Sequence, residues 1–326
     1  MRKTILGFFL LLSISSAFAQ EGKSSFDFLL LPASTRSAAL GGTNISIIEN
    51  DVSLIYDNPA ALGQEMDMSI NVNFLSYIAD IKMGSATFAK ALGERSAWGI
   101  GVNYAHYGSL LETTKESIIG DLSANDICGN VFFSRDLTDR IRGGVAAKFV
   151  YSNYGEYTAI GLGVDLGLSY YNSDKDFSFG LTGKNLGRQV KAYDEDLYSM
   201  PWDIQMGFSK RLSNAPIRFS VTAVNLNNWD FYNREGERES FFSNIGKHLV
   251  LGVEALPSDN LWIAIGYNPK RGSDLALDEG NKMAGFSIGA GLKVKAFSFG
   301  CAVSQYHPSA TSFMFNASVS LAEMKM

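Results

Sequence analysis

Cysteine and histidine are both scarce in this chain, whose 326 residues include 2 cysteines and 3 histidines. The histidines, His106, His248 and His307, have no second ligand at the spacing of a metal site, and we interpret them as polar residues of loops and strand ends. Strand parity puts Cys128 and Cys301 on opposite faces of the predicted sheet, which disfavours a disulfide. We therefore expect two buried, unpaired thiols and no metal site.

Motifs for catalysis and for nucleotide binding do not stand out either. We find no nucleophile elbow and no coupled Ser/His/Asp arrangement. Closely spaced glycines within 99–101 and 161–163 lie inside predicted strands and not in a strand–loop–helix unit, so we interpret them as packing positions on an inner face. The acidic clusters at 194–196 and 234–239 do not follow EF-hand spacing and are expected to be solvated loop charges. The protein is expected to be no enzyme and to bind no cofactor.

Basic residues are not in excess, since 28 Lys+Arg face 33 Asp+Glu and the net charge is −5. Such a balance offers no electrostatic footprint for nucleic acid. Long apolar runs are missing after the first residues, because Gly, Ser, Asn or a charge interrupts the apolar stretches at every second position. A transmembrane helix is therefore not expected, whereas a mean hydropathy of +0.01 is compatible with a membrane barrel.

The first 19 residues have the three parts of a secretory signal peptide. Arg2 and Lys3 form a basic start, and residues 5–12 form an apolar core. Ala17 and Ala19 then provide a small-residue cleavage site. The alternative, a short membrane anchor, is disfavoured because the apolar run is well short of the ~20 residues that span a bilayer. We expect an exported chain that is periplasmic, secreted or an outer-membrane barrel.

Alternating strands are predicted from residue 68 to residue 326. The pattern is clearest at 158–170, where apolar residues such as Ile160 and Leu162 alternate with glycine, serine and Asp165. We count about fourteen such runs, an even number that fits a single-chain outer-membrane barrel. Charges on the polar face are expected to point into the lumen, because a charged side chain that faces lipid has a high free-energy cost. They are Lys148, Asp165, Lys184, Lys210, Arg218, Glu254 and Lys293.

The connectors between these runs alternate in length. Four long connectors, 108–125, 187–200, 227–246 and 269–282, are separated by tight turns. Successive connectors of an up-and-down barrel fall on opposite ends, so the long ones share one end, as they do in outer-membrane barrels. The alternative, a soluble exported β protein, has no reason to produce this asymmetry and would need a second layer to bury its apolar face.

Tyrosine and tryptophan cluster near the ends of the predicted strands. Interfacial girdles of a membrane barrel place such rings at the level of the lipid headgroups, whereas β propensity alone would also enrich them in strands. We favour the girdle and assign to it, among others, Tyr107, Tyr154, Trp262 and Tyr306.

Residues 20–67 do not alternate and are predicted to form a separate segment. Residues 34–42 indicate a short capped helix that a glycine pair ends, and residues 44–48 indicate a possible short strand. Pro59 suits the first position of a helical turn. The apolar content of the segment favours a plug inside the lumen over a loosely ordered periplasmic tail. The expected organisation is a signal peptide at 1–19, a plug or hatch at 20–67 and a barrel at 68–326.

Two stretches of this segment carry a family resemblance. Asp-Asn-Pro-Ala-Ala-Leu at 57–62, just before the first barrel strand, is similar to the motif of the FadL-like barrels, in which an N-terminal hatch fills fourteen strands. Residues 28–42, with their Leu-Pro, Ser-Thr-Arg and Ala-Leu-Gly-Gly elements, resemble the opening of the PorQ family of type IX secretion barrels. Chain length and strand positions extend the resemblance over the mature chain. The plug motif consists of Arg36, Leu40, Gly41, Gly42, Asn58, Pro59 and Ala60.

The resemblance implies an accessory component of the type IX secretion system in the outer membrane. Such a barrel would anchor a surface partner of the attachment complex, a PorZ-like protein near PorV and the sortase PorU, and so help attach cargo to lipopolysaccharide. Docking is expected in loops near Leu110, Asp194, Trp229 and Arg234. The alternative, implied by the wider FadL-like fold, is an outer-membrane transporter of hydrophobic small molecules.

Overall fold

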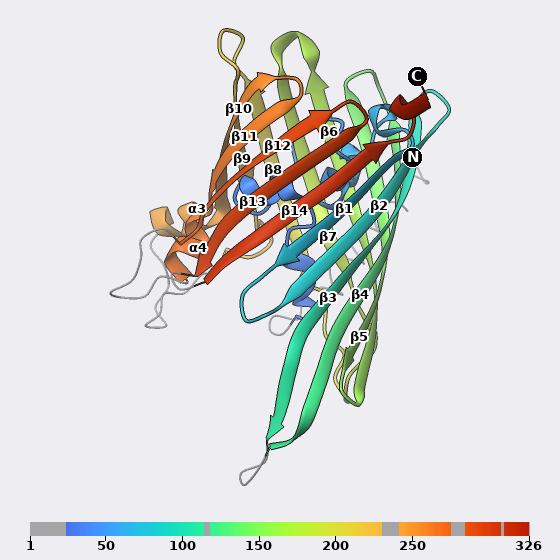
Figure 1. The fold of residues 1–326 in the computed structure, drawn as a ribbon, viewed down its shortest axis with the longest axis vertical. Helices are drawn as coiled ribbons and strands as arrows, with labels where there is room; N and C mark the ends of the chain where they lie inside the picture. The colour runs from blue at the N-terminus through green and yellow to red at the C-terminus, as the bar shows by residue number, and fades with distance from the viewer. Residues whose placement is uncertain (1–23, 114–117, 230–240, 275–283, 308–309, 326) are drawn as a thin grey trace, which may run out of the picture.

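The chain folds into a closed antiparallel β-barrel in which β14 returns to pair with β1 (Figure 1). The computed structural model describes residues 24–113, 118–229, 241–274, 284–307 and 310–325. The prediction of a fourteen-stranded antiparallel barrel is confirmed. The strands are β1 (Ser69–Ser76), β2 (Lys82–Leu92), β3 (Ser96–Thr113), β4 (Ile118–Asp136), β5 (Ile141–Tyr154), β6 (Tyr157–Asn172), β7 (Phe177–Lys191), β8 (Asp203–Arg211), β9 (Ile217–Ala223), β10 (Leu249–Ser258), β11 (Leu261–Tyr267), β12 (Phe286–Val294), β13 (Phe297–His307) and β14 (Ala310–Ser320).

The barrel wall turns its large apolar side chains outward and its polar side chains inward. In β3, Ile100 and Val102 are 47% and 37% exposed, whereas Asn103 is 6% exposed. The same inversion runs around the ring, because the exposed large side chains are mostly Leu, Ile, Val and Phe and the buried polar ones are mostly Ser, Thr and Asn. Lipid favours such a continuous apolar surface and water opposes it.

The charged side chains of the wall follow the predicted faces with one exception. Lys148, Asp165, Arg218 and Glu254 are buried inside the barrel. The prediction that Lys210 points into the lumen is wrong. Lys210 lies on the same face of β8 as the exposed Phe208, and its ammonium group donates to the carbonyl oxygen of Lys175. Lys210 lies next to the last residue of β8, where a lysine reaches solvent without crossing an apolar layer.

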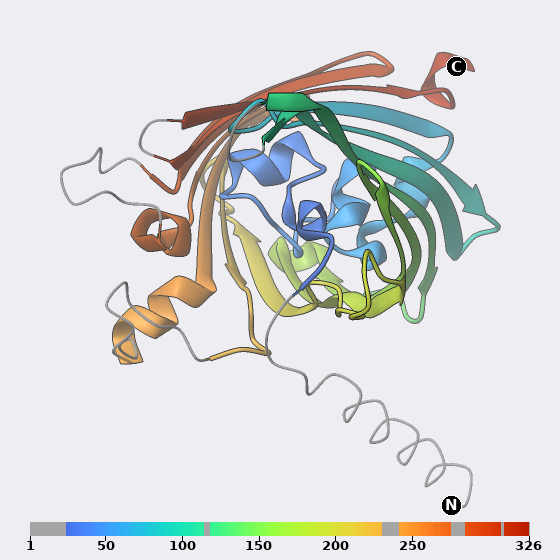
Figure 2. The same cartoon turned by 90° about the horizontal axis from the view of Figure 1, so that it is seen from below.

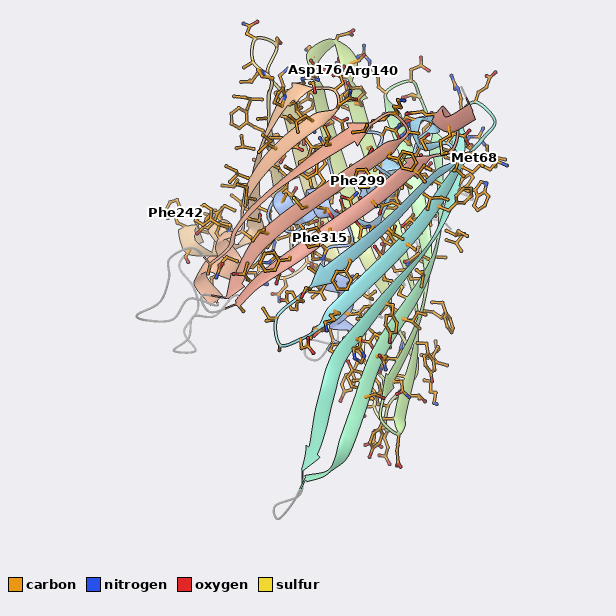
Figure 3. All side chains as sticks on the ribbon, in the orientation of Figure 1. Met68, Arg140, Asp176, Phe242, Phe299 and Phe315 are labelled. Carbon is orange, nitrogen blue, oxygen red and sulfur yellow. The ribbon has the colours of Figure 1, made fainter. Side chains whose placement is uncertain are left out.

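The two ends of the barrel differ, as the connector lengths predict. Figure 3 shows Arg140 and Asp176 in turns at one end, which we call the short-turn end. The opposite, long-loop end carries α3 (Phe241–His248) and α4 (Pro269–Asp274). The loop expected at 108–125 is wrong, since β3 and β4 keep pairing as far as Thr113 and Ile118 and form a long hairpin. Strand β7 likewise continues to Lys191.

Residues 24–67, here called the N-terminal segment, run through the interior of the barrel (Figure 2). Helix α2 (Thr35–Ala39) packs against β11 to β14, and a 3-10 helix at Pro59–Ala61 packs against β4 to β6. The segment therefore contacts opposite halves of the ring. Its other 3-10 helices are Asp27–Leu30, Val52–Tyr56 and Gln64–Met66, and a further one, Glu323–Lys325, follows β14.

Local polar contacts explain the turns of this segment. Ser34 caps α2 by accepting a hydrogen bond from the amide of Ser37, as the predicted capped helix requires. The strand expected at 44–48 is wrong, because the side-chain oxygen of Asn44 accepts from the amides of Ser46 and Ile47 and folds the chain into a turn.

The apolar core lies between the N-terminal segment and the inner face of the wall. Glycines in the wall make room for it: a Cβ added at Gly101 would lie 2.3 Å from the Tyr56 hydroxyl, and one at Gly161 would lie 2.5 Å from the Phe26 ring. The interpretation of these glycines as inner-face packing positions is confirmed. Fully buried core side chains include Leu40, Ile55, Leu62, Met66 and Phe132.

Two expectations about single side chains are wrong. Cys128 is buried, but Cys301 is exposed because it shares the outward face of β13; both thiols are unpaired.

Several aromatic residues assigned to a girdle turn inward instead, since the lumen offers them polar partners. The hydroxyls of Tyr107 and Tyr154 donate to Asp126. Trp262 lies beneath a guanidinium group and Tyr306 is buried. Within the described ranges, no helix is long and apolar enough to cross a membrane.

Candidate functional site in the barrel lumen

A cluster of four charges, three of them buried, joins the N-terminal segment to β9 and β10; the fourth, Glu49, has a side chain that is 38% exposed. Glu254 accepts hydrogen bonds from the Nε atoms of Arg36 and Arg218, both at 2.7 Å. The Nη1 atom of Arg218 also donates to Glu49 at 2.6 Å. Arg36 lies over the ring of Trp262, 5.4 Å from its centroid. The cluster therefore fixes two residues of the N-terminal segment, Arg36 and Glu49, to the wall.

Each charge in this cluster depends on the others for its stability. Burial works against the ionised form of Glu49, but Arg36 and Arg218 outweigh it and hold the pKa of Glu49 below its usual value. Glu49 consequently stays ionised at neutral pH. Buried ions are tolerated when their partners are in place and become costly when one partner is removed. The cluster is thus a specific lock between segment and wall.

The glycine pair after α2 brings the backbone of the N-terminal segment against the wall. Gly41 and Gly42 have φ values of +96° and +106°, which glycine adopts at no steric cost. The amide of Gly41 donates to the Ser287 hydroxyl at 2.9 Å, and Nη1 of Arg271 in α4 donates to the Gly41 carbonyl at 3.1 Å. Leu40, just before the pair, is 1% exposed.

Ser287 belongs to a Gly-Phe-Ser-Ile-Gly stretch at 285–289 that did not stand out in the sequence. The stretch runs straight into β12 instead of turning into a helix, so it is not a nucleophile elbow. The Ser287 hydroxyl donates to the carbonyl oxygen of Ala39 at 2.9 Å. Its role is to hold the backbone of the N-terminal segment.

Asn58 ties the segment to the far side of the wall. Its Oδ1 accepts from the amide of Ala60 at 2.9 Å and caps the 3-10 helix that starts at Pro59. Its Nδ2 donates to the carbonyl of Ile45 at 2.9 Å and to the Ser169 hydroxyl of β6 at 3.2 Å. The residues of the predicted plug motif thus lie at contacts between the N-terminal segment and the wall.

Asn58→Ala removes this cap and leaves the buried carbonyl of Ile45 without its amide donor. We expect the variant to lose about 1–3 kcal/mol of unfolding free energy. Chemical denaturation of the detergent-solubilised barrel, followed by tryptophan fluorescence, measures the loss. Asn214→Ala, in an exposed turn at the short-turn end, is the control and should stay within about 0.5 kcal/mol of the parent. Equal stability of the two variants would contradict the role of Asn58.

A cavity of about 340 Å³ lies between the N-terminal segment and strands β7 to β10. It is nearer the long-loop end, because residues of the β9–β10 and β11–β12 connectors line it. One side is apolar and is formed by Leu29, Leu30, Leu31, Pro32, Val224 and Val250. The other side carries amides and charges, from Asp57, Lys184, Asn185, Asp203, Gln205, Asn225, Asn268, Lys270 and Arg271.

The acidic groups of the cavity are engaged with protein donors. Asp57 pairs with the Lys184 ammonium at 3.2 Å. Asp203 accepts from the amide of Asn225 at 2.7 Å and from the side chain of Gln205 at 2.6 Å. The other carboxylate oxygen of Asp57, Oδ2, is buried and has no hydrogen-bond partner among the described residues. A cavity lined by leucines and by these mostly engaged polar groups suits a small molecule that is mainly apolar.

A bulge interrupts the wall beside the cavity. Strand β7 has two residues, Lys184 and Asn185, opposite the single Asp165 of β6. The amide of Asn185 donates to Asp165 at 2.6 Å, and the Lys148 ammonium pairs with the same carboxylate at 2.7 Å. Such bulges change the direction in which side chains point, and the Lys184 side chain here points to Asp57 of the N-terminal segment. Regular pairing of β7 with β8 also ends at Lys184 and Asp203.

The expected docking positions lie in different connectors. Leu110 is part of β3 in the long hairpin, and Asp194 is exposed in the β7–β8 connector. Trp229 is 49% exposed, and its ring packs on His248 with centroids 4.2 Å apart. Arg234 lies outside the described residues. In the part of the chain that the structure describes, no three His, Cys, Asp or Glu side chains are grouped as a metal site would need.

Comparisons with known proteins concern the fold. No family model and no curated protein matches the sequence. The structure is similar to the toluene transporter TbuX of Ralstonia pickettii, with a TM-score of 0.55 and 12% identity over 90% of this chain and 98% of that one. The toluene transporter TodX of Pseudomonas putida gives 0.55 and 14%, over 87% and 96%. The CymD monoaromatic hydrocarbon channel gives 0.54 and 13%, over 89% and 97%. The chain thus has the fold of the FadL-type outer-membrane barrels.

Proposed function

We propose that this protein is an outer-membrane channel for hydrophobic small molecules. The proposal is supported by the fold that it shares with two toluene transporters and a monoaromatic hydrocarbon channel. The apolar outer surface of the wall suits a lipid surrounding, and in the closed ring every strand pairs with two neighbours. The predicted signal peptide at 1–19 would bring the chain to that compartment.

The observation that carries the proposal is the cavity beside the N-terminal segment. Its apolar side includes Leu30, a large side chain that is 56% exposed where a ligand would enter. A hydrocarbon that covers this side chain removes apolar surface from water, which drives binding without any charged partner. The cavity would therefore collect hydrophobic molecules at the long-loop end.

Passage beyond the cavity requires a movement. The N-terminal segment fills the lumen, where Leu40, Ile55 and Leu62 are fully buried. In our proposal this segment is a hatch, and the cluster of Arg36, Glu254 and Arg218 sets the free energy that displacing it requires. A ligand in the cavity lies directly against the hatch, because residues 29–32 line the cavity.

Leu30→Glu tests the assignment of the cavity. The charge should weaken the apparent affinity for toluene at least about tenfold, since a buried leucine side chain is worth about 1.5–3 kcal/mol. Uptake of labelled toluene by intact cells that carry the protein in the outer membrane, corrected for the uptake by cells without it, measures the effect. Leu197→Glu is the matched control, because Leu197 is 41% exposed in the β7–β8 connector and does not line the cavity. Unchanged uptake by the Leu30 variant would overturn the assignment.

A second candidate is an accessory role in the type IX secretion system, as an anchor for a PorZ-like surface partner together with PorV and the sortase PorU. It is favoured by the interior, which the N-terminal segment occupies, and by exposed side chains such as Asp194 and Trp229 at the long-loop end. A pull-down in mild detergent separates the candidates. Recovery of one stoichiometric surface protein supports the anchor. If no such partner is recovered and cells that lack the protein take up less toluene, the channel is supported.

A further inference from the structure

We propose that the first turn of α3 anchors the long-loop end of the barrel in the lipid layer, with Phe241 and Phe242 inserted among the acyl chains. These two side chains are 70% and 84% exposed, and their rings contact each other edge to face with centroids 5.7 Å apart. Adjacent phenylalanines at this exposure present an apolar surface that water disfavours. An amphipathic helix at a lipid interface buries such a surface.

The position of α3 points to lipid. Figures 1 and 2 show α3 outside the ring of strands, next to β10, whereas the β3–β4 hairpin continues well beyond this level. Figure 3 shows Phe242 outside the wall at about the height of Phe299 and Phe315. Both of these wall residues face outward and are 54% exposed. Phe242 is therefore on the outer side of the barrel, where these wall residues also lie.

Helix α3 leads directly into the lipid-facing wall. Strand β10 begins directly after α3, and its outward residues Leu251 and Val253 are 41% and 42% exposed. The Phe241–Phe242 pair lies one short helix before these residues in the chain. The neighbouring lipid-facing wall identifies the acyl chains as the occupant.

The second half of α3 holds the helix to the barrel rim. Nδ1 of His248 donates to the carbonyl oxygen of Val224 at 2.7 Å, and Nδ2 of Asn244 donates to the carbonyl oxygen of Trp229 at 2.6 Å. The Trp229 ring packs on His248 and donates its indole N–H to Leu226 at 3.0 Å. The Phe241–Phe242 pair is thus held away from the rim, and half-exposed Trp229 suits the headgroup level beside it.

Quenching of a single fluorescent label tests the anchor. Phe242→Cys is made in a Cys301→Ser background, where the buried Cys128 does not react, and is labelled with an environment-sensitive dye. The protein is placed in phosphatidylcholine vesicles that carry a nitroxide lipid, with iodide as the aqueous quencher. The parent label at Cys301 is the reference for the lipid-facing wall. Glu195→Cys in the Cys301→Ser background, exposed at the same end, is the reference for water.

We expect the nitroxide lipid to quench the label at position 242 as it does at position 301. We also expect iodide to quench it at least about tenfold less than at position 195. Iodide quenching equal to that at position 195 overturns the proposal, as does protection that arises only when a protein partner is added. Phe241→Cys repeats the test if the first variant does not fold. Toluene uptake takes no part in this readout, so the result is independent of the proposed function.

Discussion

Glu254→Gln is expected to lower the unfolding free energy of the barrel by about 3–5 kcal/mol. The substitution keeps the shape of the side chain but removes its charge, so the guanidinium groups of Arg36 and Arg218 lose the carboxylate that both contact at 2.7 Å. Glu49, the other anion of the cluster, contacts Arg218. Arg36 would then be a buried cation on the N-terminal segment that has lost the carboxylate its Nε atom contacts and keeps only the attraction of Glu49.

Denaturant unfolding in detergent measures this loss, and Trp262 gives a local signal because it lies beneath Arg36. Limited proteolysis should also cleave residues 24–67 faster in the variant. Glu323→Gln is the matched control: it breaks the Lys293–Glu323 pair, whose side chains are 33% and 34% exposed, and should cost at most about 1 kcal/mol. A Glu254 variant that unfolds at the same denaturant concentration as the parent would show that the cluster does not lock the segment.

Gly144→Val is expected to push the N-terminal segment off the wall. A Cβ at position 144 would lie 2.3 Å from the carbonyl carbon of Pro59 and 2.4 Å from the amide nitrogen of Ala60. Backbone atoms have no rotamer by which to move aside, so the segment has to shift, at a cost of about 1–3 kcal/mol. We expect ion conductance in planar bilayers to rise from a closed baseline to open-channel steps.

Gly129→Val is the control for this experiment. Gly129 lies in the neighbouring strand β4, faces outward like Ile127 and Val131, and an added Cβ there meets nothing within 4 Å. Valine also suits a strand better than glycine does. The control should therefore keep the conductance of the parent. If neither variant conducts and both are equally stable, Pro59 and Ala60 do not seal the lumen in the way that the structure implies.

The strands of this barrel are predictable from the sequence because lipid imposes the alternation. Between Ile160 and Tyr170 each apolar residue faces outward and each small or polar one faces inward. The extension of β3 and β4 past Gly108 was not predicted, because the alternation on which the prediction depends is not required there. That part of the hairpin lies beyond the level of the other strands (Figure 1), where no lipid face demands a period of two. Main-chain pairing between β3 and β4 continues through it.

The sequence predicted which charged residues of the wall face the lumen, but not which residues they pair with. Charge on the polar face indicated that Glu254 and Arg218 face the lumen. Their partner Arg36 is 218 residues from Glu254 in sequence, and the ring register brings it there. The cavity was missed entirely, because its residues come from stretches between Leu29 and Arg271 that share no local pattern. Asp57 was noticed only as part of the family motif.

The seam between β1 and β14 has a consequence for how the barrel assembles. These strands pair from Ser69–Ser320 to Ser76–Phe313, and the N-terminal segment, which leads directly into β1, is then enclosed. After the seam has formed, the segment can enter the lumen only through an end of the barrel, because the ring of strands is closed. Because α2 contacts β11 to β14, the last strands to be made curl around the first part of the mature chain. Contacts of such long sequence separation fold slowly, so we expect the closing of the ring around the segment to be a slow step of assembly.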